Sequence, residues 1–281
     1  MSPFLRHIQA CNNAILPGRR VPFLLGATPV GYLTPGLADV LAEFPDIGRT
    51  AAGVTLNNPA ALPGIAHAAS ALGFGRDRKE AFDVKAQPGG PSLATIDRGA
   101  IPVFGIMAEG VHVNGMVRRA DGRHIWVAKR AADKAVDPGK LDHIVAGGMP
   151  AGMTPFETWI KEAAEEAAIP ESLARSARTT GSLAYAMEGT EGLRRETLYC
   201  YDIDLPEDFI PTPADGEVES FALWPLARVV EAVRDGDLFK FDVNLVLIDL
   251  FIREHLIPVA EAGDIIAALA RAKEASKRFF L

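Results

Sequence analysis

The most constraining feature of the sequence is a helical pattern that directly follows a glycine-rich bend. Residues 142–148 (DHIVAGG) predict a strand that ends in two glycines, and residues 154–168 carry the strongest helical pattern of the chain. Thr154 stands at the N-cap position, Pro155 at the first helical position, and Glu157 three residues after the cap, as in a capping box. The sequence therefore predicts a strand, a tight bend and a capped helix in immediate succession.

The predicted helix has two chemically different sides. The apolar side is formed by Phe156, Ile160, Ala163, Ala164 and Ala167. The other side presents, within an arc of roughly 100°, Glu162, Glu165 and Glu166. Neighbouring carboxylates repel one another unless a cation neutralises them, and hard divalent cations such as Mg²⁺ prefer oxygen ligands. A solvated acidic face is the alternative, but the preceding glycines favour a metal–diphosphate site, because a backbone without Cβ atoms lets a ligand approach closely.

The rest of the chain predicts a layered α+β protein. A hairpin is expected around Asp121–Gly122, between strands at 112–117 and 124–131. Later strands are expected at 182–187, 196–205 and 217–224, and later helices at 225–234, 242–255 and 260–277. The N-terminal part predicts helices at 2–14, 35–44 and 60–72 and extended segments at 21–33 and 52–56.

These patterns indicate three parts. Residues 85–100 are rich in Pro, Gly and small residues and indicate a linker or a long surface connection. We therefore expect a smaller α+β domain over 1–100, a second domain over 101–258, and a C-terminal helix over 259–281 that packs on the second domain.

Composition excludes several classes of protein. The chain has 29 Lys and Arg against 36 Asp and Glu, which gives a net charge of −7. This balance argues against a nucleic-acid coat or a basic membrane-surface protein. No apolar run is long enough to span a bilayer, and two distant cysteines do not make a disulfide framework. We expect a cytoplasmic protein with no nucleic-acid or membrane partner.

The bend and the helix resemble the Nudix box. That pattern opens with Gly and closes with Arg-Glu, an aliphatic residue, any residue, Glu-Glu, any residue, Gly and an aliphatic residue. Five positions match in register: Gly147, Glu162, Glu165, Glu166 and Ile169. Three positions depart, with Met153 in place of the first Glu, Lys161 in place of the Arg, and Ala168 in place of the late Gly. Lys161 keeps the positive charge but lacks the bidentate fork of Arg.

Longer stretches resemble one branch of the Nudix hydrolases. These stretches are 110–117, 125–152, 201–211 and 215–226. The branch is associated with thiamine pyrophosphokinase and carries an extra N-terminal domain of unknown function. The resemblance implies an α/β/α sandwich with a mixed sheet, and a hydrolase that cleaves diphosphates of damaged thiamine such as oxythiamine. ADP-ribose or 8-oxo-(d)GDP is the alternative substrate class. A binding module without turnover is an alternative of another class, and a homodimer is a family-level expectation.

The resemblance also implies roles for individual residues. The expected cofactor is Mg²⁺, with Mn²⁺ as an alternative, and the expected ligands are Glu162, Glu166, Glu165 and the carbonyl group of Ala146. A general base or an extra ligand is expected from Glu217 or Glu219, which could equally be exposed strand residues.

Substrate phosphates are expected to meet both glycines and basic side chains. The expected residues are Gly147, Gly148, Gly152, Lys161, Lys129 and Arg130. Only one of Lys129 and Arg130 should reach the site if their strand is regular. We expect His112, His124 and His143 to be structural.

Overall fold

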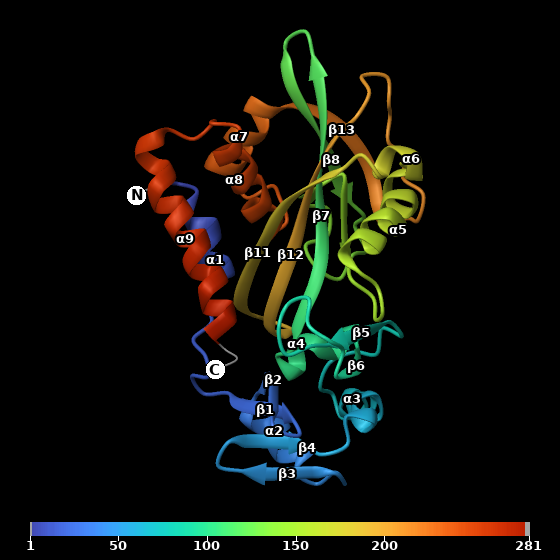
Figure 1. The fold of residues 1–281 in the computed structure, drawn as a ribbon, viewed down its shortest axis with the longest axis vertical. Coiled ribbons are helices and arrows are strands. Elements are labelled where there is room, and N and C mark those ends of the chain that lie inside the picture. The colour runs from blue at the N-terminus through green and yellow to red at the C-terminus, as the bar shows by residue number, and fades with distance from the viewer. Residues whose placement is uncertain (1, 279–281) are drawn as a thin grey trace.

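A seven-stranded mixed sheet forms the centre of the computed structural model, which describes residues 2–278 (Figure 1). Its strands are β7 (Met107–Arg119), β8 (Gly122–Arg130), β9 (Leu141–Asp142), β10 (Val145–Gly148), β11 (Arg178–Gly189), β12 (Gly192–Asp204) and β13 (Val218–Pro225). The main order is β11-β12-β7-β8-β13, while β10 pairs with β7 and β9 pairs with β8. Among the paired strands of this sheet, β7 and β12 are parallel and the other pairs are antiparallel. The predicted hairpin joins β7 to β8.

Helices cover both faces of this sheet. On one face α5 (Pro155–Ala167) and the short α6 (Glu171–Ala174) pack on a core that includes Val111 and Val113 of β7. On the other face α7 (Leu226–Asp235) and α8 (Val243–Arg253) pack on a core that includes Met116 and Ile125. Side chains alternate between the two faces along each strand, so one sheet can bury two cores. The predicted α+β class, with a mixed sheet between helices, is confirmed.

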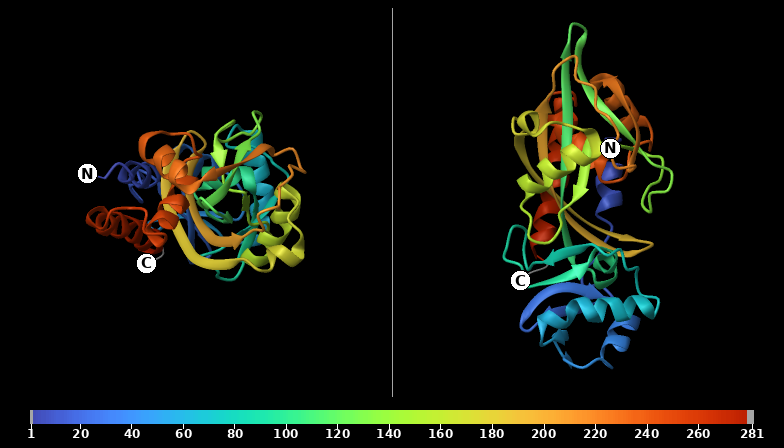
Figure 2. Two further views of the ribbon diagram at one scale, coloured as in Figure 1. Left: turned by 90° about the horizontal axis from the view of Figure 1, so that it is seen from above. Right: turned by 90° about the vertical axis from the view of Figure 1, so that its right-hand side faces the viewer.

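The first and the last helix of the chain lie side by side. Helix α1 (Leu5–Cys11) lies beside α9 (Val259–Arg278), and both are on the side of the sheet opposite to α5 (Figure 2, left). Phe4, Ile8 and Cys11 belong to the same core as α8, and α9 packs along β11. The first helix therefore joins the core of the C-terminal part, although about ninety residues separate it from β7 in the sequence.

A smaller sheet forms the N-terminal part and lies below the larger one in Figure 1. Its elements are β1 (Val21–Leu25), β2 (Thr28–Leu33), α2 (Pro35–Leu41), β3 (Ile47–Thr50), β4 (Gly53–Leu56), η1 (Pro59–Ala61) and α3 (Leu62–Ala71). The strand order is β2-β1-β4-β3. Its core is separate from the two cores of the larger sheet.

The stretch 85–100 is a surface connection only in its first half: residues 86–93 are largely exposed and have no helix or strand, whereas residues 94–100 are regular. It contains β6 (Ala94–Asp97), which pairs with β5 (Ala81–Val84), followed by η2 (Arg98–Ala100) and α4 (Ile101–Phe104). Ile96 and Phe82 are buried in the N-terminal core, so the stretch is ordered by pairing with residues outside it. This β5–β6 hairpin lies between the N-terminal sheet and the larger sheet (Figure 2, right).

Candidate active site

The bend and helix are formed as the sequence predicts. Strand β10 ends at Gly148, and α5 begins at Pro155 behind the N-cap Thr154. The Thr154 hydroxyl accepts a hydrogen bond from the Glu157 amide at 3.2 Å, while the Glu157 carboxylate accepts one from the Thr154 amide at 2.9 Å. This reciprocal capping box satisfies two amides that the first helical turn would otherwise leave without partners.

The apolar side of α5 fixes the rotation of the helix. Trp159 is fully buried, and its indole N–H donates to the Ala174 carbonyl oxygen at 3.0 Å. Ala163 and Ala167 are fully buried against the sheet as well. Because these side chains face the core, the glutamates that stand between them along the sequence are turned toward the β10 edge.

Glu166 is the most deeply buried of the three glutamates. Only 5% of its surface is exposed, and its Oε2 accepts a hydrogen bond from the Ala146 amide at 2.9 Å. Burial raises the pKa of Glu166 well above its ordinary value, because the carboxylate loses water and gains only this one amide donor. A cation at this carboxylate would remove the cost of burying its charge.

Glu162 lies directly against the glycine bend. A Cβ atom on Gly147 would stand 2.6 Å from Cγ and Cδ of Glu162, so only glycine leaves room for this side chain. Burial also raises the pKa of Glu162, which faces the same cavity as Glu166. The match of Gly147 to the Nudix box thus has a local steric reason.

Glu165 is more exposed and is held by Lys161. The Lys161 ammonium lies 2.5 Å from the Glu165 carboxylate and 3.1 Å from that of Glu162. The Glu165 side chain is 48% exposed, against 13% for Glu162. The structure therefore brings all three predicted glutamates to one cavity, with Glu162 and Glu166 at its inner wall and Glu165 near its mouth.

A second acidic group approaches Glu166 from the loop before β13. Carboxylate oxygens of Glu166, Asp215 and Glu217 lie within 4.8 Å of one another. Burial raises the pKa of Glu217, but the Lys134 ammonium that binds its carboxylate outweighs this effect. The charges of Arg98 and Arg130 act in the same direction, so the pKa of Glu217 is lower than its ordinary value.

Sequence reasoning found Glu217 but missed Asp215. Both belong to the segment DGEVES, in which the resemblance implied Glu217 or Glu219 as the later carboxylate. The strand starts only at Val218, however, and its register shifts between Val218 and Ser220. Asp215 instead accepts a hydrogen bond from the Glu217 amide at 2.8 Å, and the spacing of an Asx turn was the signal available in the sequence.

Three of the residues considered for the site do not line the cavity. Lys129 and Glu219 pair with each other at 2.7 Å, and their side chains are 45% and 48% exposed. Gly152 forms a left-handed turn with φ of 81°, and its amide donates to Asp83 at 2.8 Å. The alternation of β8 directs Lys129 outward and leaves Arg130 at the cavity.

Arg130 lines the cavity but is already engaged. Its guanidinium donates to the Asp142 carboxylate at 2.7 Å and to the carbonyl oxygens of Val136 and Asp137 at 2.8 and 3.1 Å. These bonds hold the segment that also carries Lys134. In this structure Arg130 therefore supports the cavity wall, while Gly147 and Gly148 form the wall itself.

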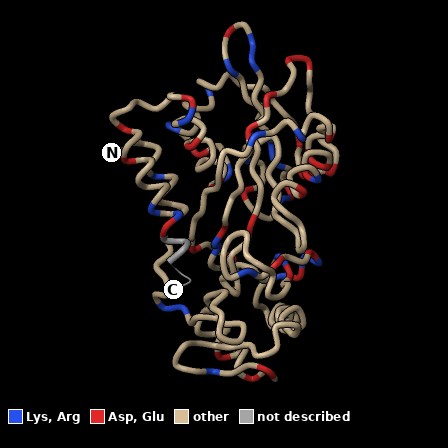
Figure 3. The backbone as a smooth tube through the Cα atoms, in the orientation of Figure 1, with Lys and Arg blue, Asp and Glu red and all other residues tan. Residues whose placement is uncertain are grey.

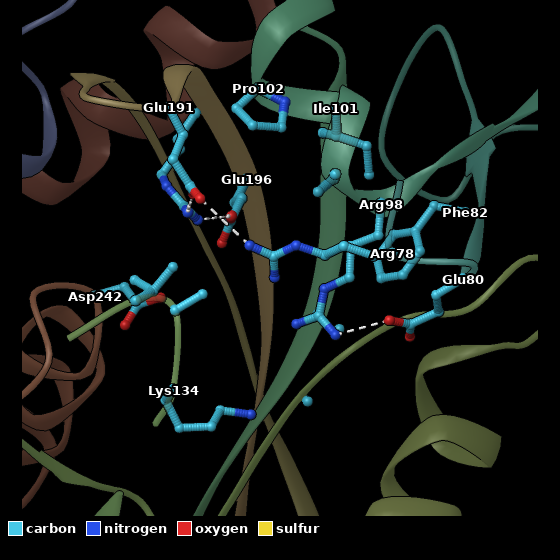
Figure 4. A pocket seen from close by; sticks show the side chains of 18 of the residues that line it. Arg78, Glu80, Phe82, Arg98, Ile101, Pro102, Lys134, Glu191, Glu196 and Asp242 are labelled. Carbon is cyan, nitrogen blue, oxygen red and sulfur yellow. Dashed lines mark hydrogen bonds and ion pairs between the residues drawn. The ribbon is translucent and has the colours of Figure 1, made fainter. Parts of the chain in front are cut away.

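The cavity has a volume of about 1270 Å³ and is lined from both parts of the chain (Figure 4). The N-terminal part contributes Arg78, Glu80, Phe82, Arg98, Ile101 and Pro102. The larger sheet and its loops contribute the acidic groups described above together with Lys134, Glu191, Glu196 and Asp242. Acidic and basic residues are interspersed along the chain (Figure 3), and both kinds reach this cavity. The sequence had offered no chemistry in the N-terminal part.

His112 and His143, two of the three histidines that we expected to be structural, form a buried pair. The Nδ1 atoms of His112 and His143 lie 3.1 Å apart, and their rings meet edge to face. Burial lowers the pKa of both groups, which favours neutral rings joined by an N–H···N hydrogen bond. One oxygen of Asp142 also lies within 4.8 Å of them, but the Asp142 carboxylate is bound to Arg130.

The acidic groups suit a hard divalent cation. Burial raises the pKa of both Glu162 and Glu166, and for Glu162 this effect outweighs the nearby Lys161 ammonium, so a further cation would favour both charged carboxylates. The donor atoms are carboxylate oxygens, which Mg²⁺ and Mn²⁺ prefer over soft ligands. By this chemistry the residues fit the metal that the Nudix pattern implies.

Known proteins are similar to this chain over the region that holds the site. The NUDIX domain model matches residues 109–243, which include the bend, α5 and Asp215. The chain is 37% identical over 276 residues to Nudix hydrolase 24, chloroplastic, of Arabidopsis thaliana, covering 94% of this chain and 76% of that protein. It is 35% identical over 283 residues to Nudix hydrolase 20, chloroplastic, of the same plant, with the same coverage.

A fold comparison gives a weaker likeness. The crystal structure of DR0079 from Deinococcus radiodurans superposes with a TM-score of 0.47 at 19% identity, covering 62% of this chain and 98% of that one.

The chain belongs to the Nudix hydrolase family. Its box keeps the three glutamates and the first glycine, and the changes at Met153, Lys161 and Ala168 leave the bend and helix intact. Among residues 2–278, no helix combines the length and apolar character needed to cross a membrane.

Proposed function

We propose that this Nudix hydrolase cleaves a diphosphate joined to an organic group with the help of Mg²⁺ or Mn²⁺. The observation that carries the proposal is the meeting of Glu162 and Glu166, at the glycine bend, with Asp215 and Glu217 from a distant loop. Glu162, Glu166 and Asp215, with the carbonyl group of Ala146 as a further donor, would hold the cation, and Glu217 would stand beside them. When bound, the cation would offset the negative charge that develops on the diphosphate.

The residues of the chain would bind the substrate and move a proton. Lys161 and Lys134 reach the cavity and can donate to phosphate oxygens. Glu217 is kept ionised by the Lys134 ammonium, so its carboxylate can accept the proton of the attacking water. Glu165, near the mouth of the cavity, is the second candidate for this base.

The organic group would occupy the remainder of the cavity. About 1270 Å³ is more than a diphosphate alone needs, since pockets for drug-sized ligands span roughly 300–1,000 Å³. The resemblance to the thiamine-associated branch supports oxythiamine or a related damaged thiamine as this group. ADP-ribose and 8-oxo-dGDP, the alternative substrates, are compatible with the same volume.

The test is a substrate panel with matched variants. The full chain is incubated with Mg²⁺ and oxythiamine diphosphate, ADP-ribose or 8-oxo-dGDP, and the products and kcat/KM are measured. Glu166→Gln should lower kcat/KM by about 100-fold or more, because removal of one group that stabilises transition-state charge has this effect. Glu219→Gln, which changes an exposed carboxylate outside the cavity, should leave turnover unchanged.

Two outcomes would overturn the proposal. Equal turnover by wild type and Glu166→Gln would show that the Glu166 carboxylate is not needed for hydrolysis. Calorimetric binding of diphosphates with no product after long incubation with Mg²⁺ or Mn²⁺ would instead indicate a binding module. A cytoplasmic location and a homodimer remain predictions that cell fractionation and sedimentation can test.

A further inference from the structure

We propose that the N-terminal part supplies a wall of the substrate site, on which Arg98 binds a phosphate group of the diphosphate. This inference rests on the proposed function, because that function supplies the diphosphate whose phosphate group Arg98 would bind. It gives the N-terminal part a role in the reaction, whereas the sequence left that role open.

The β5–β6 hairpin of the N-terminal part is bound directly to the glycine bend. The Ala151 amide donates to the Ala81 carbonyl oxygen at 2.8 Å, beside the bond from Gly152 to Asp83. A Cβ atom on Gly148 would stand 2.7 Å from Cζ of Phe82, so the aromatic ring rests on the glycine backbone. The hairpin therefore helps to fix the shape of the bend, and the Glu162 side chain packs against the same bend.

A buried ion pair holds the same two parts together nearby. The Lys85 ammonium lies 2.7 Å from the Glu109 carboxylate, and both side chains are at most 10% exposed. The Gly89 amide and the Tyr199 hydroxyl donate to the other Glu109 oxygen at 2.8 and 2.6 Å. Because this carboxylate has three donors, the position of the hairpin against β7 is well defined.

Arg98 follows directly after this hairpin and reaches the cavity. Its guanidinium lies 2.9 Å from the Glu80 carboxylate and 5.6 Å from the centre of the Phe82 ring. Its Nη2 atom lies 3.6 Å from the position that a Cβ on Gly148 would occupy. Arg98 is therefore oriented by two residues of its own part while it faces the bend of the other part (Figure 4).

Basic side chains that could meet a phosphate line the cavity together with the carboxylates, and Arg98, Lys134 and Lys161 each pair with a glutamate. The carboxylates of Glu162 and Glu166 form one wall, and the cationic side chains of Arg98, Lys134 and Lys161 stand around it. A diphosphate that shares a cation with the carboxylates would leave oxygens free for these side chains. The planar fork of an arginine can donate two parallel hydrogen bonds to a phosphate, whereas an ammonium has three donors but no fixed planar geometry.

The test measures anion binding separately from turnover. Inorganic pyrophosphate with Mg²⁺ is titrated into the full chain by calorimetry, and kcat and KM are measured with the substrate that the wild type hydrolyses. Arg98→Gln should weaken pyrophosphate binding and raise KM by about 10- to 100-fold, as loss of a charged hydrogen bond implies. Arg98→Lys should recover part of this loss, because it keeps the charge without the fork.

Arg49→Gln is the matched control. Arg49 lies on β3 of the same part, pairs with the exposed Asp39 and does not line the cavity, so pyrophosphate binding should not change. If Arg98→Gln lowers the melting temperature but binds pyrophosphate and substrate like the wild type, Arg98 is only structural and the inference is overturned. If the wild type itself neither binds pyrophosphate nor hydrolyses any diphosphate, the proposed function fails instead.

Discussion

Replacement of Gly147 by Ala should lower the activity of the protein much more than its stability. The new Cβ atom would stand 2.6 Å from Cγ and Cδ of Glu162, whereas carbon atoms in contact lie about 3.5–4.0 Å apart. Glu162 must therefore move by about 1 Å or adopt another rotamer, which costs on the order of 1 kcal/mol. A displacement of this size at a reacting centre can cost about 100-fold in rate.

We therefore expect kcat/KM to fall by about 100-fold while the free energy of unfolding falls by only about 1 kcal/mol. The assays are product release with Mg²⁺ and urea denaturation followed by circular dichroism. Gly64→Ala is the control, because Gly64 lies exposed in α3 with no atom within 4 Å of the new Cβ. That change should stabilise the helix slightly and leave turnover unaltered.

A double-mutant cycle tests the steric argument itself. If Gly147→Ala acts only by displacing Glu162, it should cost little further activity when Glu162 is already Gln. Full additivity of the two losses would refute the reasoning, and so would wild-type kcat/KM in Gly147→Ala.

Three further predictions concern stability. Ala168 ends α5 in the left-handed region at φ of 51°, so Ala168→Gly should stabilise the protein by about 1 kcal/mol in denaturation experiments and leave turnover unchanged. The pKa of Glu166 is raised, so the folded state holds a proton that the unfolded state releases, and metal-free stability should fall as pH rises above about 4.5. With a chelator present, Glu166→Gln should thus melt higher than wild type at pH 8, and Mg²⁺ should raise the melting temperature of wild type more than that of the variant. Trp159→Phe removes the indole donor from the Ala174 carbonyl, which keeps the Ala177 amide at 3.1 Å, and should cost about 0.5–1.5 kcal/mol by urea denaturation; no change would contradict the assigned bond.

Sequence reasoning worked where the structure is governed by neighbours along the chain. The capping box at Thr154 was predicted at its observed position, and the hairpin turn expected at Asp121–Gly122 lies one residue earlier, at 120–121. Turns and caps depend on a few adjacent residues, which is why they could be predicted.

The rotation of α5 was predicted only in part. Ala163 and Ala167 are buried as expected, but Phe156 and Ala164 of the predicted apolar side are exposed. Trp159, which was not placed on that side, is fully buried, because packing against the sheet and α6 sets the rotation.

Features that depend on distant residues were predicted less well. The stretch 85–100 resembles a linker in composition, yet β6 is ordered because it pairs with β5 and buries Ile96. The bulge in β13 separates Glu219 from Glu217, and no local signal marks such a register shift. Arg98 precedes the helix by more than fifty residues, so only the folded chain shows that it reaches the bend.

The ion pair between Lys85 and Glu109 also bears on how the protein can be divided. Its two residues stand on opposite sides of residue 100, where composition suggests a boundary. A fragment starting at residue 101 would retain the acidic partner and lose both the ammonium and the Gly89 amide. It would also lose Phe82, so the glycine backbone would become open to water. Low activity in such a fragment would therefore reflect an incomplete site rather than a weak enzyme.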